Sequence, residues 1–145
     1  MNLHEKMPPV RGTIEYTIYR RGKPIEHVVE HNLVVDGGRN RLAQLISGKS
    51  TAAVKYIGFG EGNNLAQLSD TGLTNQQLFE ITGSTVDGSD AIFSWYLSET
   101  DANSMNICEF GLFSSDTVML TRQVRGQVMG KNADMTVDGL YTLQF

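Results

Sequence analysis

The sequence has a single cysteine, Cys108, among 145 residues. No disulfide can therefore form within the chain, and a thiolate metal site has too few ligands. No histidine or acid stands at a recognisable spacing from Cys108, so we expect a small buried hydrophobic side chain rather than a nucleophile. His27 and His31 share one face of an expected strand. A metal site would need a third ligand, so we expect cross-strand hydrogen bonding or partial exposure for both.

Long apolar runs are also missing. No stretch approaches the roughly 20 consecutive apolar residues of a membrane-spanning helix. Residues 1–9 lack the apolar segment of a signal peptide or a membrane anchor. We therefore expect residues 1–10 to be a flexible N-terminal segment, and the protein to be synthesised in a cytoplasm without membrane insertion.

Positive charge is scarce after residue 50. Residues 1–50 carry eight Lys/Arg against five Asp/Glu, a net charge of +3, whereas residues 51–145 carry four against eleven, a net charge of −7. A general nucleic-acid binder needs clustered cations for its phosphate contacts, so the acidic part argues against that class. The uneven charge permits head-to-tail assembly of copies, although solvated faces of one sign are the simpler interpretation.

Catalytic motifs are absent from the sequence. It contains no H-E-x-x-H, G-x-S-x-G, P-loop or C-x-x-C pattern, and nothing selects a carboxylate pair of the kind that glycosidases use. Glu109 stands out, because it lies inside an expected strand and must face water or find a hydrogen-bonding partner. We predict neither an enzyme nor a protein that binds a metal or a cofactor. Other acidic residues lie mainly in expected turns, where aspartate serves backbone geometry: Asp87, Asp90, Asp116, Asp134 and Asp138.

The sequence does contain stretches in which apolar and polar residues alternate. Hydrophobic residues make up 40% of the chain. That content suffices for one domain with its own core over residues 11–145. Residues 11–20 alternate apolar and polar side chains, and residues 25–35 are rich in β-branched residues. With the turn between them, they predict an N-terminal β-hairpin over residues 11–35.

One short helix is predicted over residues 39–47. Asp36-Gly37-Gly38 before it is interpreted as the turn that ends the hairpin, and Gly48 should end the helix. We expect its apolar stripe to pack against the sheet and its two arginines to project into solvent. The stripe is formed by Leu42, Leu45 and Ile46, and the arginines are Arg39 and Arg41.

The remainder, residues 53–145, predicts strands separated by turns. The expected strands cover residues 53–59, 78–86, 91–98, 106–113, 117–124 and 135–145. An Asp-Gly turn at residues 87–90 is a strong hairpin signal. About eight strands with one short helix predict a mostly β fold, either an antiparallel β-sandwich or a partly open barrel. The last strand presents one apolar face: Met135, Val137, Tyr141, Leu143 and Phe145.

The stretch from Tyr56 to Asn75 joins a strand to a polar loop. Gly58, Gly60 and Gly62 occupy every second position in it. A dinucleotide fingerprint requires G-x-G-x-x-G at the start of a helix in a βαβ unit, which this stretch does not provide. Glycine here is expected to allow close backbone approach, a bulge or a bend at a sheet edge. In the loop, residues 69–72 predict a turn in which Asp70 and Thr71 hydrogen-bond nearby backbone N–H groups.

Several short motifs in this order resemble those of a known group. They are Y-I-G-F-G-E-G at 56–62, S-D-T-G-L-T-N at 69–75, E-F-G-L-F at 109–113, V-M-L-T-R at 118–122 and T-L-Q-F at 142–145. The order is similar to that in small tail-associated structural proteins of tailed bacteriophages and prophages, including tail-fibre and baseplate components. The similarity covers roughly residues 32–145, and the glycine-rich segment 126–132 departs from the usual pattern.

The resemblance implies a virion structural subunit of a tail, baseplate or fibre-attachment region. Such a subunit acts through protein–protein contacts in a symmetric assembly, as a homo-oligomer with other phage tail proteins as partners. It also implies fold-defining, non-catalytic positions for the residues that match: Gly58, Phe59, Gly60, Asp70, Thr71, Leu73, Glu109, Gly111, Leu112, Phe113 and Arg122.

A receptor- or carbohydrate-binding module at a fibre tip, facing a host surface receptor, is the alternative. It would need exposed aromatic side chains, and the candidates are Tyr19, Trp95 and Tyr96. Trp95 alternates with Phe93 and Leu97, so we expect it in the core. An enzyme that degrades surface polysaccharide is a more distant third hypothesis.

Overall fold

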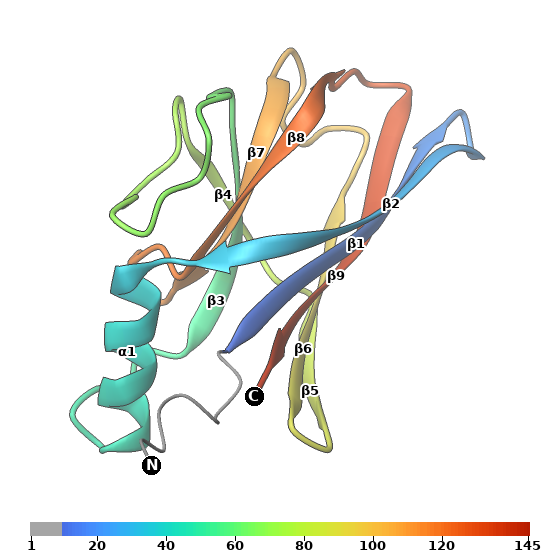
Figure 1. Cartoon of the computed structure of the whole chain (residues 1–145). Helices are drawn as coiled ribbons and strands as arrows, with labels where there is room; N and C mark the ends of the chain where they lie inside the picture. Colours follow the sequence, from blue (N-terminus) through green and yellow to red (C-terminus); the bar gives the residue numbers. More distant parts are fainter. Residues whose placement is uncertain (1–9) are drawn as a thin grey trace.

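The structure, a computed structural model of the chain, describes residues 10–145. Residues 1–9, which make up most of the predicted flexible N-terminal segment, lie outside the described residues. Residues 10–145 contain one sheet of nine antiparallel strands and one short helix (Figure 1). The predicted mostly β class with one short helix is therefore confirmed.

The sheet curls around its core. Its strands follow the order β4-β3-β7-β8-β2-β1-β9-β6-β5. Because the curled sheet is open along part of its length, the partly open barrel describes it better than two stacked sheets do (Figure 1). The elements are β1 Arg11–Arg20, β2 Lys23–Val34, α1 Asp36–Ile46, β3 Val54–Gly60, β4 Gln77–Glu80, β5 Gly83–Asp87, β6 Asp90–Leu97, β7 Asn106–Ser114, β8 Thr121–Gly130 and β9 Met135–Gln144.

The single strand predicted at residues 78–86 is wrong, because this segment forms two strands, β4 and β5, at opposite edges of the sheet. The chain crosses between the edges at Ile81 and Thr82. The Ile81 N–H donates to the Lys55 carbonyl of β3 at 3.0 Å, and the Thr82 N–H donates to the Ser94 carbonyl of β6 at 2.7 Å. The curl brings the two edges together, and two adjacent residues join them.

Alternating side chains of β1, β6 and β9 form much of the core, as their periodicity predicts. Trp95 is 1% exposed and therefore lies in the core, as expected. Its ring centroid lies 5.4 Å from that of Phe59, and the Tyr16 and Phe110 centroids lie 5.1 Å apart. Aromatic rings of four strands thus meet at the centre of the curled sheet.

The helix begins three residues earlier than predicted, so Asp36-Gly37-Gly38 is its first turn rather than a separate turn. Glycine is needed at position 38, because a Cβ there would lie 2.1 Å from the Leu120 carbonyl oxygen. Gly48 has φ +75° after the helix, in agreement with its predicted role as a stop signal. Ile46 is exposed, so the expected apolar stripe packs only in part.

Two further expectations about strands need correction. The strand expected at residues 117–124 begins only at Thr121, because Thr117 has φ 66° and belongs to a tight turn in which the Ser114 N–H donates to the Val118 carbonyl. The glycine-rich segment after Val124 continues this strand to Gly130. In β9 the predicted apolar face is buried from Met135 to Leu143, but Phe145 is exposed.

Candidate functional site

Residues from three distant segments meet where the loop after β3 crosses β7 and β8. Glu109 comes from β7, Arg122 from β8, and Asp70 from the loop between β3 and β4. We call Asp70, Glu109 and Arg122, with the backbone N–H groups that they bind, the carboxylate cluster. These three residues belong to the motifs that carry the resemblance.

Glu109 is the centre of the carboxylate cluster and is 1% exposed. Its Oε1 accepts a hydrogen bond from Arg122 Nε at 2.9 Å. Its Oε2 accepts from the backbone N–H groups of Gly62 and Thr74, at 2.6 and 2.8 Å. The expected hydrogen-bonding partners of Glu109 are therefore three donors: the cationic side chain of Arg122 and two backbone N–H groups of the loop.

Arg122 connects Glu109 to Asp70 in the loop between β3 and β4. Its side chain is 6% exposed, and its Nη1 donates to Asp70 Oδ2 at 2.9 Å. The same oxygen accepts from the Gln67 N–H at 2.8 Å, so Asp70 holds its own turn, as predicted. Thr71 is exposed, and among the described residues its side chain makes no hydrogen bond.

The alternating glycines of β3 serve close approach, as expected. A Cβ on Gly60 or on Gly62 would lie 2.6 Å from Glu109 Oε2. A Cβ on Gly58 would lie 2.4 Å from the Phe113 ring. The G-x-G-x-G stretch therefore lies against an anion, and this anion is the protein's own Glu109 rather than a nucleotide phosphate.

The other residues of the resemblance surround the carboxylate cluster. Phe59 and Leu112 lie in the main core. Phe113 belongs to a second core cluster with Val35, against which Leu73 packs. A Cβ on Gly111 would lie 2.7 Å from the Thr121 carbonyl oxygen, so β7 and β8 approach closely at this point.

The carboxylate cluster is suited to holding a loop in place rather than to acid–base chemistry. Both oxygens of Glu109 are occupied by donors, so the carboxylate is oriented toward the loop backbone. No group of three or more His, Cys, Asp or Glu side chains within residues 10–145 could hold a metal ion. Over the same residues, no helix is long and apolar enough to cross a membrane.

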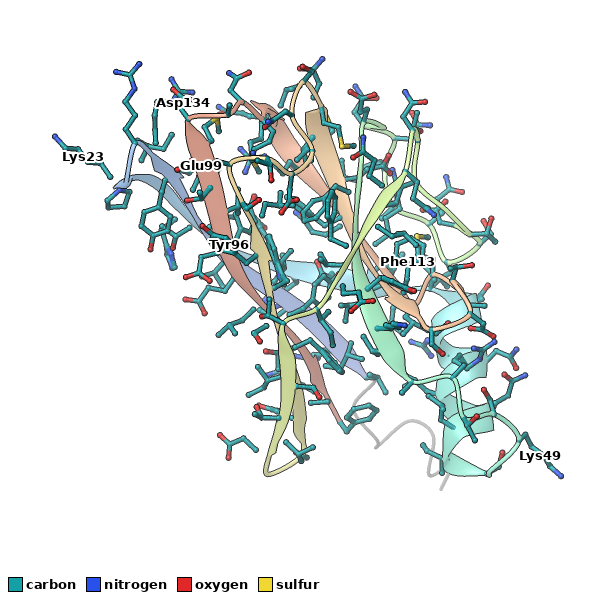
Figure 2. The ribbon with its side chains drawn as sticks, turned by 180° about the vertical axis from the view of Figure 1, so that it is seen from behind. Lys23, Lys49, Tyr96, Glu99, Phe113 and Asp134 are labelled. Atoms are coloured by element: carbon teal, nitrogen blue, oxygen red, sulfur yellow. The ribbon has the colours of Figure 1, made fainter. Side chains whose placement is uncertain are left out.

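The aromatic candidates for ligand binding do not come together. Trp95 is buried, Tyr19 is half-buried, and Tyr96 is 45% exposed. Tyr96 lies on the outer face of β6, far from Phe113 and the helix (Figure 2). There it is opposite Asp138 of β9.

The outer face also contains His27, whose predicted cross-strand role is confirmed. Its Nδ1 lies 2.8 Å from Thr17 Oγ1, and its Nε2 lies 3.2 Å from Glu15 Oε1. These three residues line a shallow cavity of about 160 Å³ together with Asp138 and Leu140. Cys108 is buried, as expected of an inert thiol.

Sequence reasoning missed the role of Arg41, which was expected to project into solvent. Its side chain is only 12% exposed, and Nη1 lies 2.5 Å from Asp116 Oδ1. Nη1 also donates to Ser114 Oγ at 3.3 Å. Hydrogen bonds from Arg41 and Ser114 lower the pKa of Asp116 to about 2. The pair joins helix α1 to the turn after β7, and the separation of 75 positions in the sequence hides it from local patterns.

Arg125 is a second missed residue. From β8 it reaches across to β2, where Nη2 donates to Glu26 Oε1 at 2.8 Å. Nη1 donates to the Tyr16 hydroxyl, and the guanidinium lies 5.6 Å from the ring centroid. Burial raises the pKa of Tyr16, although the neighbouring Arg125 opposes the shift.

Lys131 is a third missed residue and is fully buried. Its Nζ donates to Asn103 Oδ1 at 3.0 Å and to the Asn132 carbonyl at 3.1 Å. Burial lowers its pKa, and acidic neighbours that include Asp134 partly compensate. Asp134 lies at the end of the molecule near the β1–β2 hairpin tip (Figure 2).

Comparisons of the chain with models of protein families, with curated proteins and with solved structures give no match.

Proposed function

We propose that the chain is a structural subunit of a bacteriophage tail, baseplate or tail-fibre attachment region. In this role it is not an enzyme, it is located in the virion, and it acts by contacts with other tail proteins in a symmetric homo-oligomeric assembly. One observation carries the proposal: Gly60, Asp70, Glu109 and Arg122, which belong to four separate motifs of the resemblance, lie together around the buried carboxylate of Glu109.

The chemistry of the described residues also favours a structural role. Five cavities among the described residues measure about 160 to about 280 Å³, less than the roughly 300–1,000 Å³ of typical small-molecule sites. The ionic groups of the carboxylate cluster are engaged with one another and with the backbone. A subunit of this kind gains rigidity from such contacts and presents its surface to neighbours.

Purified phage particles from the bacterial host provide the test. The chain would carry a short C-terminal epitope tag, and quantitative mass spectrometry with immunogold electron microscopy would locate it. We expect several copies per particle, with label confined to the tail. Host cytosolic proteins, which should be depleted to background, serve as the control. Intact particles without the chain would overturn the proposal.

A carbohydrate-binding module is a second candidate, because exposed Tyr96 lies beside polar groups on the outer face. Stacking of a sugar ring on an exposed aromatic side chain would give such binding. A glycan array probed with the chain and with Tyr96→Ala would test it. Binding that Tyr96→Ala abolishes would support this candidate, and no binding at all would remove it.

A further inference from the structure

Strand β2 leaves one of its edges unpaired along most of its length. On one side it pairs with β1 from Asn32 to Lys23. On the other side only Leu33 and Val34 pair with β8. The two strands meet beside helix α1 and separate toward the tip of the β1–β2 hairpin (Figure 1). We call the space between residues 24–32 of β2 and residues 123–130 of β8 the wedge.

Backbone hydrogen-bonding groups of β2 point into the wedge. The Val35 N–H donates to the Leu120 carbonyl at 3.1 Å, so odd-numbered residues at this end of β2 face β8. Ladder hydrogen bonds alternate along an antiparallel strand. His27, Val29 and His31 therefore direct their N–H and C=O groups away from β1, and no strand of the described chain pairs with them.

The wedge contains open space beside the Arg125–Glu26 ion pair that crosses it. Two cavities, of about 170 and about 200 Å³, lie along it. Glu26, Arg125 and Gln127 line both of them, so the two cavities adjoin each other. At the rim, Ile25 and Val29 of β2 are 55% and 58% exposed. Exposed apolar side chains beside unpaired backbone groups are typical of sites that bind an extended segment by strand addition.

The charge of the wedge indicates which kind of segment would bind there. Glu26 and Glu30 point to the same face, and both line the first cavity. Glu26 pairs with Arg125, whereas within residues 10–145 no cation lies within 4.0 Å of Glu30. In the register that sets Glu26 opposite Glu30, two copies joined antiparallel through their β2 edges would oppose like charges, which is destabilising. An extended segment with a lysine or arginine opposite Glu30 would instead complement this carboxylate.

We propose that the β2 edge in the wedge binds an extended cationic segment of a partner protein by strand addition. The backbone of the segment bonds to His27, Val29 and His31, a cationic side chain faces Glu30, and its alternate apolar side chains pack on Ile25 and Val29. The inference rests on the proposed function, because it names a surface that would hold the chain in its assembly.

Two synthetic peptides test the inference. Both are acetylated and amidated, with nine residues that alternate valine with lysine in one and valine with glutamate in the other. We expect the lysine peptide to shift the amide NMR signals of His27, Val29 and His31 in the full chain. The glutamate peptide should bind at least about tenfold more weakly, because like charges would then face one another. Equal binding of the two peptides, or shifts outside the wedge, would overturn the inference.

Variants at one position separate backbone from side-chain effects. Val29→Pro removes an N–H that points into the wedge but no bond to β1, and should weaken lysine-peptide binding at least about tenfold. Val29→Thr keeps the N–H and should bind within a factor of about three. If Val29→Pro does not fold, Glu30→Gln, a change at an exposed side chain, replaces it and should also weaken binding of the lysine peptide. Undiminished binding by the folded variant would contradict the inference.

Incorporation of the chain into phage particles distinguishes failure of this inference from failure of the proposed function. If the wild-type chain is absent from particles, the proposed function fails whatever the peptides do. If the wild-type chain is present and folded Val29→Pro enters particles equally well, the proposed function stands and the inference about the wedge fails.

Discussion

A single buried carboxylate, that of Glu109, connects two strands and a loop. Burying an ionised group is unfavourable unless charge and hydrogen bonds compensate it. Arg122 supplies the charge, and the N–H groups of Gly62 and Thr74 supply the hydrogen bonds. Because all three donors face one side chain, this residue decides where the loop after β3 lies.

Replacing Glu109 by glutamine should be strongly destabilising. The side chain keeps its shape, but its amide NH₂ would face either Arg122 or the two backbone N–H groups, all of which are donors. We expect the free energy of unfolding to fall by about 3–5 kcal/mol, as when one partner of a buried ion pair is removed. Urea unfolding monitored by circular dichroism measures this.

Glu80→Gln is the matched control for that substitution. The Glu80 carboxylate is mostly exposed and lies 3.8 Å from Lys55 Nζ. Its loss should change the free energy of unfolding by less than about 0.5 kcal/mol. Equal effects of the two substitutions would show that Glu109 does not depend on its buried partners.

Asp70→Ala should lower stability by a smaller amount. Asp70 Oδ2 accepts from Arg122 and from the Gln67 N–H, but its side chain is 24% exposed, so water replaces part of what is lost. We expect the free energy of unfolding, measured in urea, to fall by about 1–3 kcal/mol. Ser69→Ala, at the exposed neighbouring position, is the control. An unchanged melting midpoint of Asp70→Ala would rule out its role in the loop.

Gly139→Ala should disturb the aromatic core. A Cβ at this position of β9 would lie 2.2 Å from two atoms of the Trp95 indole. Overpacking of this kind typically costs about 1–3 kcal/mol. Trp95 is the only tryptophan in the chain, so its fluorescence reports the change directly. Gly126→Ala, where a Cβ would have no neighbour within 4 Å, should leave the spectrum unchanged.

Helix α1 is held by a few contacts with residues that are distant in sequence. Its apolar stripe packs only in part, and an isolated helix of this length is marginal in water. Arg41 joins it to the turn after β7 through Asp116 and Ser114. Gly38 lets its first turn lie against the Leu120 backbone. The helix is therefore held by a close backbone contact at one point and an ion pair at another.

The ion pair should make stability depend on acid pH. The pKa of Asp116 is about 2 in the folded chain, below its ordinary value of 3.8. Its contribution is therefore present above about pH 4 and is lost as the pH falls toward 2. Asp116→Asn should lower the melting midpoint at pH 7 and by much less at pH 2.

Asp87→Asn, at the exposed end of β5, controls for the general loss of a negative charge. It should lower the melting midpoint by less than Asp116→Asn at pH 7. A decrease for Asp116→Asn that is the same at pH 7 and at pH 2 would mean that the carboxylate is not paired with Arg41.

At the scale of the whole molecule, the curled sheet is nearly closed in one place and open in another. Ile81 and Thr82 join its two edges between β3 and β6. Between β2 and β8 the ladder ends after two residue pairs, and Arg125 crosses the space that remains. The wedge is therefore a feature of the sheet as a whole, although it is formed by two strands.

Amide hydrogen exchange should reveal the wedge as an alternation along β2. Val28 and Glu30 donate toward β1 and should exchange slowly, whereas His27, Val29 and His31 donate toward the wedge and should exchange quickly. Amides of the buried strand β7 provide the slow reference in the same experiment. Uniform protection from residue 27 to residue 31 would mean that the wedge is closed in solution.

Local patterns predicted much of the fold but only part of the site. Alternation located the hairpin of β1 and β2 and placed Trp95 in the core, because burial repeats every second residue in a strand. The same approach marked Glu109 as a carboxylate in need of a partner. It could not select Arg122 as that partner, and it placed Arg41 in solvent, because both pairings depend on how distant strands are arranged.

The sequence by itself determined the mostly β class, most of the strands and the helix. These are consequences of periodicity, which acts over a few residues. Only the tertiary structure decided that residues 78–86 split between two edges, that Asp70, Glu109 and Arg122 meet, and that β2 keeps an open edge. Such features follow from the curl of the sheet, which brings distant residues together and separates β2 from β8.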